Sequence, residues 1–188
     1  AKGQSSFGRD QDDVIFMPLK TAKQRIVGGR TGAGDAVDSI YIKAQSSELV
    51  AYVEIAVAEL LREDVDELVN LGCTYIQIDA PHYTLLVDPK FREFYAQRGK
   101  PADQWLDFGM ELDNLVIGDR PGVSFAFHLC RGNQGSRWLV AGGYDQIASQ
   151  IFKRIKASRL MLEYDDERSG SFEALAEIPD DKMAVLGL

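Results

Sequence analysis

The chain has 188 residues, of which 45% are hydrophobic and 27% charged, a composition that favours about one globular domain and excludes disordered and fibrous proteins. Its 21 Lys and Arg against 29 Asp and Glu give a formal net charge of -8, so nucleic acid and anionic membrane surfaces are not expected partners. There is no long apolar run, the N-terminus is polar, and the two cysteines suit a reducing compartment, so we expect a cytoplasmic protein without a membrane span.

The first quarter of the chain carries weak signals. Residues 1–12 are polar and rich in Gly and Ser, which predicts a frayed terminus followed by one domain over 13–188. Short β-rich runs come next, and the clearest is SIYIKA over 39–44. A long helix is predicted over 48–71, because apolar residues recur there at three- and four-residue spacing and Gly72 ends the pattern.

Strands and helices alternate through the rest of the chain. The predicted strands are TYIQIDA, VSFAFHLC, SRLMLEYD and MAVLGL, at 74–80, 123–130, 158–165 and 183–188. The predicted helices cover 90–99, 101–118, 144–157 and 172–178, and a loop is predicted over 82–89. Such alternation predicts an α/β protein with a parallel sheet, either doubly wound or a (β/α)8 TIM barrel.

Polar side chains gather at the carboxyl ends of three predicted strands. Alternation along the strands places these residues on one face: Tyr75, Gln77 and Asp79; Ser124, Ala126, His128 and Cys130; Arg159, Met161, Glu163 and Asp165. Bulky residues on the opposite face suit covering helices, and small or functional ones suit a barrel interior. We therefore expect a TIM-type barrel, incomplete in this chain because a full barrel takes about 250 residues.

His128 and Cys130 form an H-x-C pair, which puts two metal ligands side by side on one strand face, roughly 6.6 Å apart along the backbone. Glu163 lies one βα unit later, at the end of the next strand. Imidazole, thiolate and carboxylate are the ligands of a catalytic Zn2+. The alternative is that His128 is a hydrogen-bonded polar residue and Cys130 a small buried hydrophobe.

Three motifs, IQIDAP, HLCRGN and LMLEYD, occur in this order one unit apart. They resemble the catalytic barrel of the cobalamin-independent methionine synthase family, especially its short single-barrel members, over roughly 48–188. The resemblance implies that His128, Cys130 and Glu163 bind zinc and that Asp79 holds substrate. It also implies methyl transfer from a folate to a homocysteine-like thiol, whereas a close relative of the family opens epoxides with another thiol.

The chain departs from that family in its first 45 residues, which do not match the family's early strands, and at two points near the expected site. Ala80 stands where the family usually has an acid, and the family's fourth zinc ligand, a Cys on a later strand, is not found in this sequence. Cys73 lies about 20 Å along the strand from Asp79, so we expect it to be a packing residue.

Other features leave alternatives open. Arg131 and Asn133 follow the H-x-C pair and either orient an anionic substrate group or shape the turn. The sequence TGAGD over 31–35 resembles the anion-hole motif of sugar kinases, but a flexible loop is the preferred interpretation. A non-catalytic partial barrel is the rival to an enzyme: it would bind a partner through its open sheet edge, as a homo-oligomer or with a complementary chain.

Overall fold

The computed structural model describes residues 44–97, 99, 101–132 and 139–187. The expected frayed terminus and boundary at 12/13, the early β-rich runs, the TGAGD motif and Asn133 lie outside these residues. From Ser46 onward the chain forms one compact unit, and the description that follows concerns this unit.

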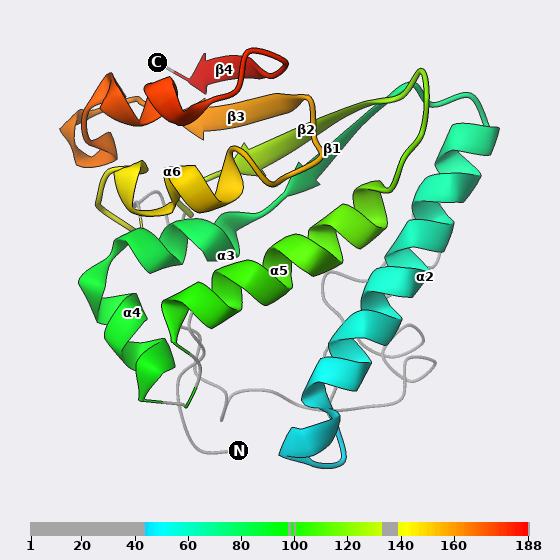
Figure 1. The fold of residues 1–188 in the computed structure, drawn as a ribbon, viewed down its shortest axis with the longest axis horizontal. Helices are drawn as coiled ribbons and strands as arrows, with labels where there is room; N and C mark the ends of the chain where they lie inside the picture. Colours follow the sequence, from blue (N-terminus) through cyan, green and yellow to red (C-terminus); the bar gives the residue numbers. More distant parts are fainter. Residues whose placement is uncertain (1–43, 98, 100, 133–138, 188) are drawn as a thin grey trace, which may run out of the picture. The chain divides into compact units, whose positions relative to one another are not determined.

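Four strands form one parallel sheet in the order β1-β2-β3-β4 (Figure 1). Their bounds are Tyr75–Asp79 for β1, Ser124–Leu129 for β2, Arg159–Glu163 for β3 and Met183–Gly187 for β4. All four predicted strands are thereby confirmed. In the register Asp79 pairs with His128, and Glu163 pairs with Gly187, so the carboxyl ends of the strands lie along one edge of the sheet.

The predicted TIM barrel is wrong. The described residues form an open sheet in which each strand pairs with its neighbour in sequence, and β1 and β4 are the two edges. The alternation of small or polar with bulky side chains favoured a barrel interior, but a sheet with helices on one face alone requires the same pattern. The alternation of side chains along a strand therefore indicates which face the helices cover, but it does not indicate whether the sheet closes into a barrel.

Helices occupy the connections between the strands. Their bounds are Ser47–Leu49 (η2), Val50–Asn70 (α2), Pro81–Thr84 (α3), Leu85–Val87 (η3), Pro89–Ala96 (α4), Ala102–Ile117 (α5), Asp145–Ile151 (α6), Glu167–Ser169 (η4) and Phe172–Glu177 (η5). The helices predicted over 48–71 and 101–118 are confirmed. None of the helices within the described residues has the length and apolar content that crossing a membrane requires.

Three connecting segments differ from the prediction. The segment 82–89 is helical rather than a loop, because prolines occupy the first helical position of both α3 and α4. Helix α6 ends at Ile151 rather than at residue 157, since the side-chain amide of Asn114 bonds the backbone of Arg154 and Lys156 beyond it. The predicted helix over 172–178 is a 3-10 helix.

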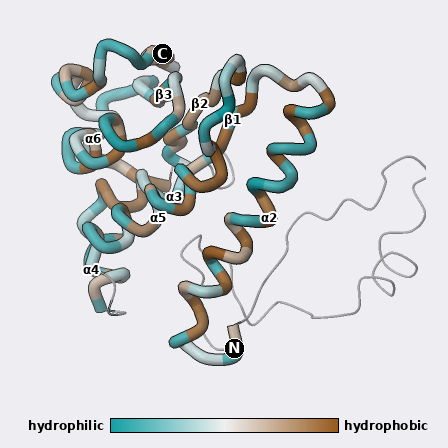
Figure 2. Tube along the Cα trace, turned by 45° about the vertical axis from the view of Figure 1, so that its right-hand side comes forward, coloured by the Kyte–Doolittle hydropathy of each residue, from teal (hydrophilic) through white to brown (hydrophobic). Residues whose placement is uncertain are grey.

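The core lies between the sheet and the helices. Figure 1 shows the main helices gathered on one side of the strands, and the strand residues that face them are buried: Phe125, Phe127, Leu129, Leu160 and Leu162. Brown, hydrophobic segments recur along β2, α5 and α2 in Figure 2. The bulky residues of β2 and β3 are buried as predicted, whereas Ala126, which was predicted on the open face, is also fully buried. The open face carries the polar residues at the carboxyl edge.

Candidate active site

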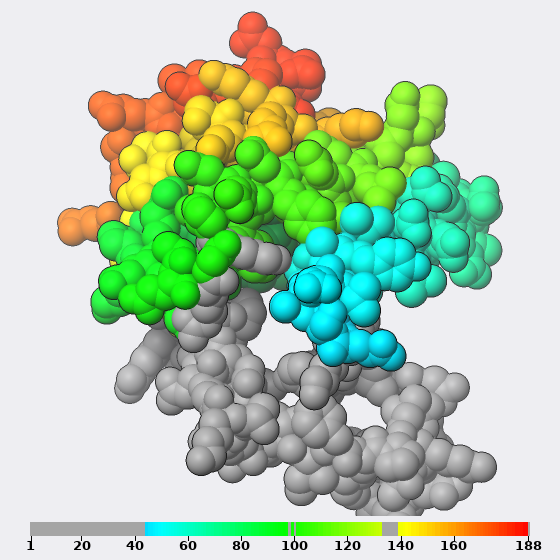
Figure 3. Space-filling model, turned by 60° about the horizontal axis from the view of Figure 1, so that its bottom comes forward, coloured from blue at the N-terminus to red at the C-terminus, as the bar shows by residue number. Residues whose placement is uncertain are grey.

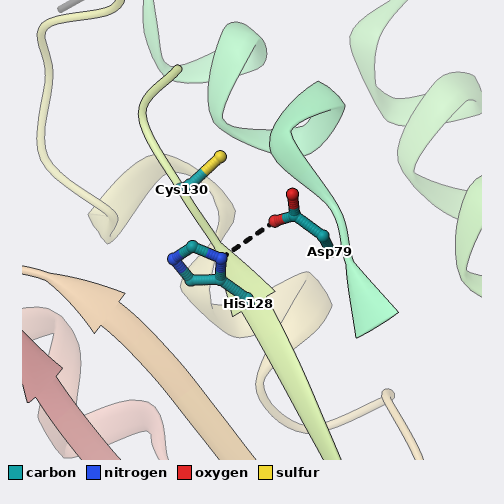
Figure 4. Close-up of side chains that lie close together, drawn as sticks. All are labelled: Asp79, His128 and Cys130. Atoms are coloured by element: carbon teal, nitrogen blue, oxygen red, sulfur yellow. Dashed lines mark ion pairs between the residues drawn. The ribbon is translucent and has the colours of Figure 1, made fainter. Parts of the chain in front are cut away.

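Asp79 and His128 form the centre of the site. They are register partners at the carboxyl ends of β1 and β2, and the two side chains point toward each other (Figure 4). His128 Nδ1 lies 2.9 Å from Asp79 Oδ1, an ion-pair contact that leaves the other ring nitrogen, Nε2, free of Asp79. Histidines that bind metal ions commonly contact a carboxylate through their other ring nitrogen.

Cys130 completes a cluster with these two residues. Within the described residues, one ligand atom from each of Asp79, His128 and Cys130 lies within 4.8 Å of the others. Burial, with the negative charges of Asp79 and Glu163 adding to it, raises the pKa of the Cys130 thiol. A thiol at this position is therefore protonated at neutral pH unless a cation stabilises the thiolate.

Glu163, at the end of β3, lies beside His128 but is not part of the cluster of Asp79, His128 and Cys130. Its Oε1 lies 3.7 Å from His128 Nε2, and the backbone N–H of Arg131 donates to its other oxygen, Oε2, at 2.9 Å. Two ligand atoms of one tetrahedral zinc lie about 3.4 Å apart, given bonds of about 2.0–2.1 Å. The spacing of the imidazole and the carboxylate thus fits a shared ion.

The structure places the expected substrate residue, Asp79, in a cluster with His128 and Cys130, and it places the expected ligand Glu163 beside His128 alone. His128, Cys130 and Glu163 lie on adjacent strand ends, as inferred, but Asp79 contacts His128 directly. Sequence reasoning missed this contact, although the signal was present: Asp79 and His128 have the same inward parity at the ends of consecutive strands. Asp79 is therefore an orienting group for His128 in addition to any substrate contact.

Arg131 is turned away from the cluster. Its side chain is fully buried, and its guanidinium donates to the backbone carbonyls of Gly142 and Ser169. The same group stacks on the ring of Tyr144, 4.3 Å from its centroid. Of the two roles considered from the sequence, the observed contacts are those of a residue that shapes the loop.

His82 lies close to the cluster, on helix α3. Burial lowers the pKa of its imidazole to about 4, against the opposing effect of the negative charge on Asp79. The ring packs against that of Tyr83, with centroids 4.1 Å apart. His82 is therefore a neutral imidazole at pH 7 beside the carboxylate of Asp79.

Comparison with known proteins gives two long matches. The uncharacterized protein YxjH of Bacillus subtilis strain 168 is 33% identical over 133 residues, which make up 70% of this chain and 35% of YxjH. The uncharacterized protein YxjG of the same strain is 34% identical over 134 residues, with the same coverage of both chains. This chain thus spans about a third of the length of these relatives, and neither name states an activity.

A shorter match involves a transport protein. Over 62 residues the chain is 34% identical to the macrolide export ATP-binding/permease protein MacB of Rhodospirillum rubrum, which covers 33% of this chain and 9% of MacB. No family model matches the chain. The comparisons therefore relate the larger part of the chain to two Bacillus proteins whose chemistry is not described by their names.

Proposed function

We propose that this chain is a zinc-dependent S-methyltransferase that activates a homocysteine-like thiol, in the manner of the cobalamin-independent methionine synthases that its motifs resemble. The observation that carries the proposal is the cluster of Asp79, His128 and Cys130 at the carboxyl edge of the sheet. Imidazole, thiolate and carboxylate are the donors that zinc takes in proteins. Parallel α/β proteins also use this edge for ligands.

In the proposed site His128, Cys130 and Glu163 hold the ion. Zinc in such a site supplies the positive charge that stabilises the thiolate of a bound thiol. Asp79 Oδ1 holds the proton on His128 Nδ1, which leaves Nε2 as the metal-binding nitrogen. The backbone N–H of Arg131 holds Glu163 Oε2 and leaves Oε1 directed toward His128.

Asp79 has a second role in the proposed reaction. Its side chain is 59% exposed, so an outward carboxylate oxygen is available to the ammonium group of an amino-acid thiol. The substrate thiol loses its proton, and its sulfur forms a bond to the methyl carbon as the bond from that carbon to the donor nitrogen breaks. The donor nitrogen then takes up a proton. A methylated folate is the proposed donor and the cytoplasm the proposed location.

The test measures thiol methylation by the full chain. We expect the zinc-loaded protein to convert homocysteine and a methylated folate to methionine, detected by mass spectrometry, and Cys130→Ser to lose this activity. Cys73→Ser is the matched control, because the Cys73 thiol bonds the carbonyl of Tyr75 at the opposite end of β1. Equal methionine formation by wild type and Cys130→Ser, or by metal-free protein, would contradict the proposal.

A further inference from the structure

Tyr144 joins the ends of the two strands that carry the proposed zinc ligands. This fully buried residue directly precedes α6. Its hydroxyl donates to the carbonyl of Leu129 at 2.9 Å and accepts from the backbone N–H of Glu163 at 2.9 Å. Leu129 is the residue before Cys130, so the hydroxyl is bonded to the backbone on both sides of the site.

The two hydrogen bonds of the Tyr144 hydroxyl form a bridge between the strand ends, and this bridge begins where the strand pairing ends. The last register pair of β2 and β3 is Leu129 with Leu162. Cys130 and Glu163 are the next residues after this pair on the two strands. Buried backbone groups require hydrogen-bond partners. Here the Tyr144 hydroxyl is the partner of one backbone group at the end of each strand, the carbonyl of Leu129 and the N–H of Glu163. Because the hydroxyl contacts both strand ends at once, it sets the distance between them beside the two proposed ligands.

The phenol ring is held on two sides. The guanidinium of Arg131 lies over it at 4.3 Å, and the ring of Tyr164 packs against it with centroids 5.4 Å apart. Arg131 also donates its backbone N–H to the Glu163 carboxylate. Glu163 is thus placed twice, at its backbone by Tyr144 and at its side chain by Arg131.

We propose that Tyr144 is a positioning residue for the metal site, because its hydroxyl fixes the backbone at Leu129, next to Cys130, and at Glu163. The inference rests on the proposed function, since it takes His128, Cys130 and Glu163 as the ligands. Partners of metal ligands commonly change metal affinity 10- to 100-fold when they are removed. Loss of this hydroxyl removes the link between the two strand ends without removing a ligand.

Tyr164 provides a matched control. It is 7% exposed and belongs to the same cluster of rings, but its hydroxyl has no hydrogen-bond partner within the described part of the chain. Tyr144→Phe and Tyr164→Phe therefore delete the same atom from neighbouring rings, and one deletion alone breaks the bridge.

The experiment measures zinc affinity of the full chain by competition with a chelator, together with the absorption spectrum of the Co2+-loaded protein and the melting of the metal-free protein. We expect Tyr144→Phe to bind zinc about 10- to 100-fold more weakly and to show altered thiolate-to-cobalt absorption, and Tyr164→Phe to stay within about threefold of wild type. If Tyr144→Phe melts earlier while its zinc affinity and cobalt spectrum are unchanged, the bridge is merely structural and the inference is overturned.

Two further outcomes separate the inference from the proposed function. Wild-type protein that binds no zinc overturns both. Wild-type protein that binds zinc but methylates no thiol overturns the proposed function and leaves the affinity comparison decisive for Tyr144. Should Tyr144→Phe fail to fold, p-aminophenylalanine at position 144 restores a donor at the same place. Near wild-type zinc affinity in that variant supports the bridge, and a loss as large as that expected for Tyr144→Phe contradicts it.

Discussion

Asp79 and His128 face each other in register, and the 2.9 Å contact between His128 Nδ1 and Asp79 Oδ1 leaves the other ring nitrogen, Nε2, free of Asp79. An amide in place of the carboxylate keeps the shape of Asp79 but removes its charge, and it permits the other imidazole tautomer. The orientation of His128 is therefore a property of this pair rather than of the histidine alone.

We predict that Asp79→Asn weakens zinc binding by about 10-fold or more, because the second partner of a ligating histidine fixes its tautomer and raises its basicity. Isothermal titration with zinc measures the change. Asp119→Asn, at an exposed position in the turn before β2, removes the same charge away from the site and is expected to leave the affinity unchanged. Equal affinities for Asp79→Asn and wild type would show that the pair does not prepare His128.

A second carboxyl is coupled to stability. Asp113 accepts a hydrogen bond from the buried hydroxyl of Tyr83 at 2.5 Å, and burial raises the pKa of its carboxyl to about 6, although this hydrogen bond acts in the opposite direction. A folded-state pKa above the unfolded value of about 3.9 means that the fold favours the neutral acid. The resulting stability is fully present below pH of about 4 and is lost as the pH rises through about 6.

We therefore predict that Asp113 lowers the free energy of unfolding by at most about 3 kcal/mol between pH of about 4 and about 6.5, and that His82, with its lowered pKa, contributes in the opposite direction over the same range. In Asp113→Asn this part of the pH dependence is expected to disappear. Urea unfolding at half-unit pH intervals measures both curves. Parallel curves for the two proteins over this range would refute the assignment to Asp113.

Some properties of single residues could be predicted from the sequence and others could not. The positions of Asp79, His128 and Glu163 on one face of the strand ends followed from parity, because strand alternation has a period of two. The buried position of Arg131 did not follow, since arginine is almost never fully buried and its carbonyl partners belong to loops distant in sequence. The role of Tyr144 was equally hidden, because its hydroxyl bonds backbone groups that carry no sequence signature.

Among the elements, helix α5 shows packing outweighing propensity. Gly109 lies in the middle of this helix, where alanine is normally better by about 1 kcal/mol. A Cβ at this position would lie 2.5 Å from the Tyr83 hydroxyl oxygen, and Tyr83 is 1% exposed. The glycine thus makes room for the hydrogen bond between Tyr83 and Asp113.

We predict that Gly109→Ala destabilises the chain by about 1–3 kcal/mol, because displacing a buried aromatic ring costs more than helix propensity contributes. In a Tyr83→Phe background the oxygen that the new methyl group would meet is absent, so the same substitution is expected to cost clearly less. A double-mutant cycle of unfolding free energies measures the coupling. Additive effects would mean that the methyl group and the hydroxyl do not compete.

The elements themselves were largely predictable where their pattern was long. Helix α2 and helix α5 followed from apolar spacing, and the strands from β-branched and aromatic runs. The segment after β1 was missed, because two prolines that begin helices α3 and α4 were read as signs of a loop. Helix α6 was predicted too long, since the contacts of Asn114 that replace its last turn are tertiary.

The described part of the chain leaves apolar side chains exposed and strand edges open. Large side chains are exposed on α2 and beside it: Leu49, Tyr52, Ile55, Leu60, Leu61, Leu68 and Leu71. Figure 3 shows this helix, in blue to teal, at the surface beside the green side chains of α5. The strands β1 and β4 are also unpaired on their outer sides in the sheet. Exposed apolar surface and open strand edges both favour association.

We predict that the chain self-associates, so that light scattering at micromolar concentration gives a mass above 20.9 kDa. Lysine at both Leu60 and Leu71, which are 61% and 79% exposed, is expected to lower that mass without loss of folding. Glu59→Lys adds a positive charge at a neighbouring exposed position and serves as the control. A cooperative monomer of 20.9 kDa in the unmodified chain would contradict the prediction.

In the proposed site Cys130 places a sulfur on a metal ion at the carboxyl edge of the sheet. X-ray absorption at the zinc edge of the loaded Cys73→Ser chain measures this directly, because Cys130 is then the one cysteine left. The predicted spectrum contains one sulfur at about 2.3 Å with nitrogen and oxygen neighbours at about 2.0–2.2 Å. A zinc shell of nitrogen and oxygen alone would contradict the claim.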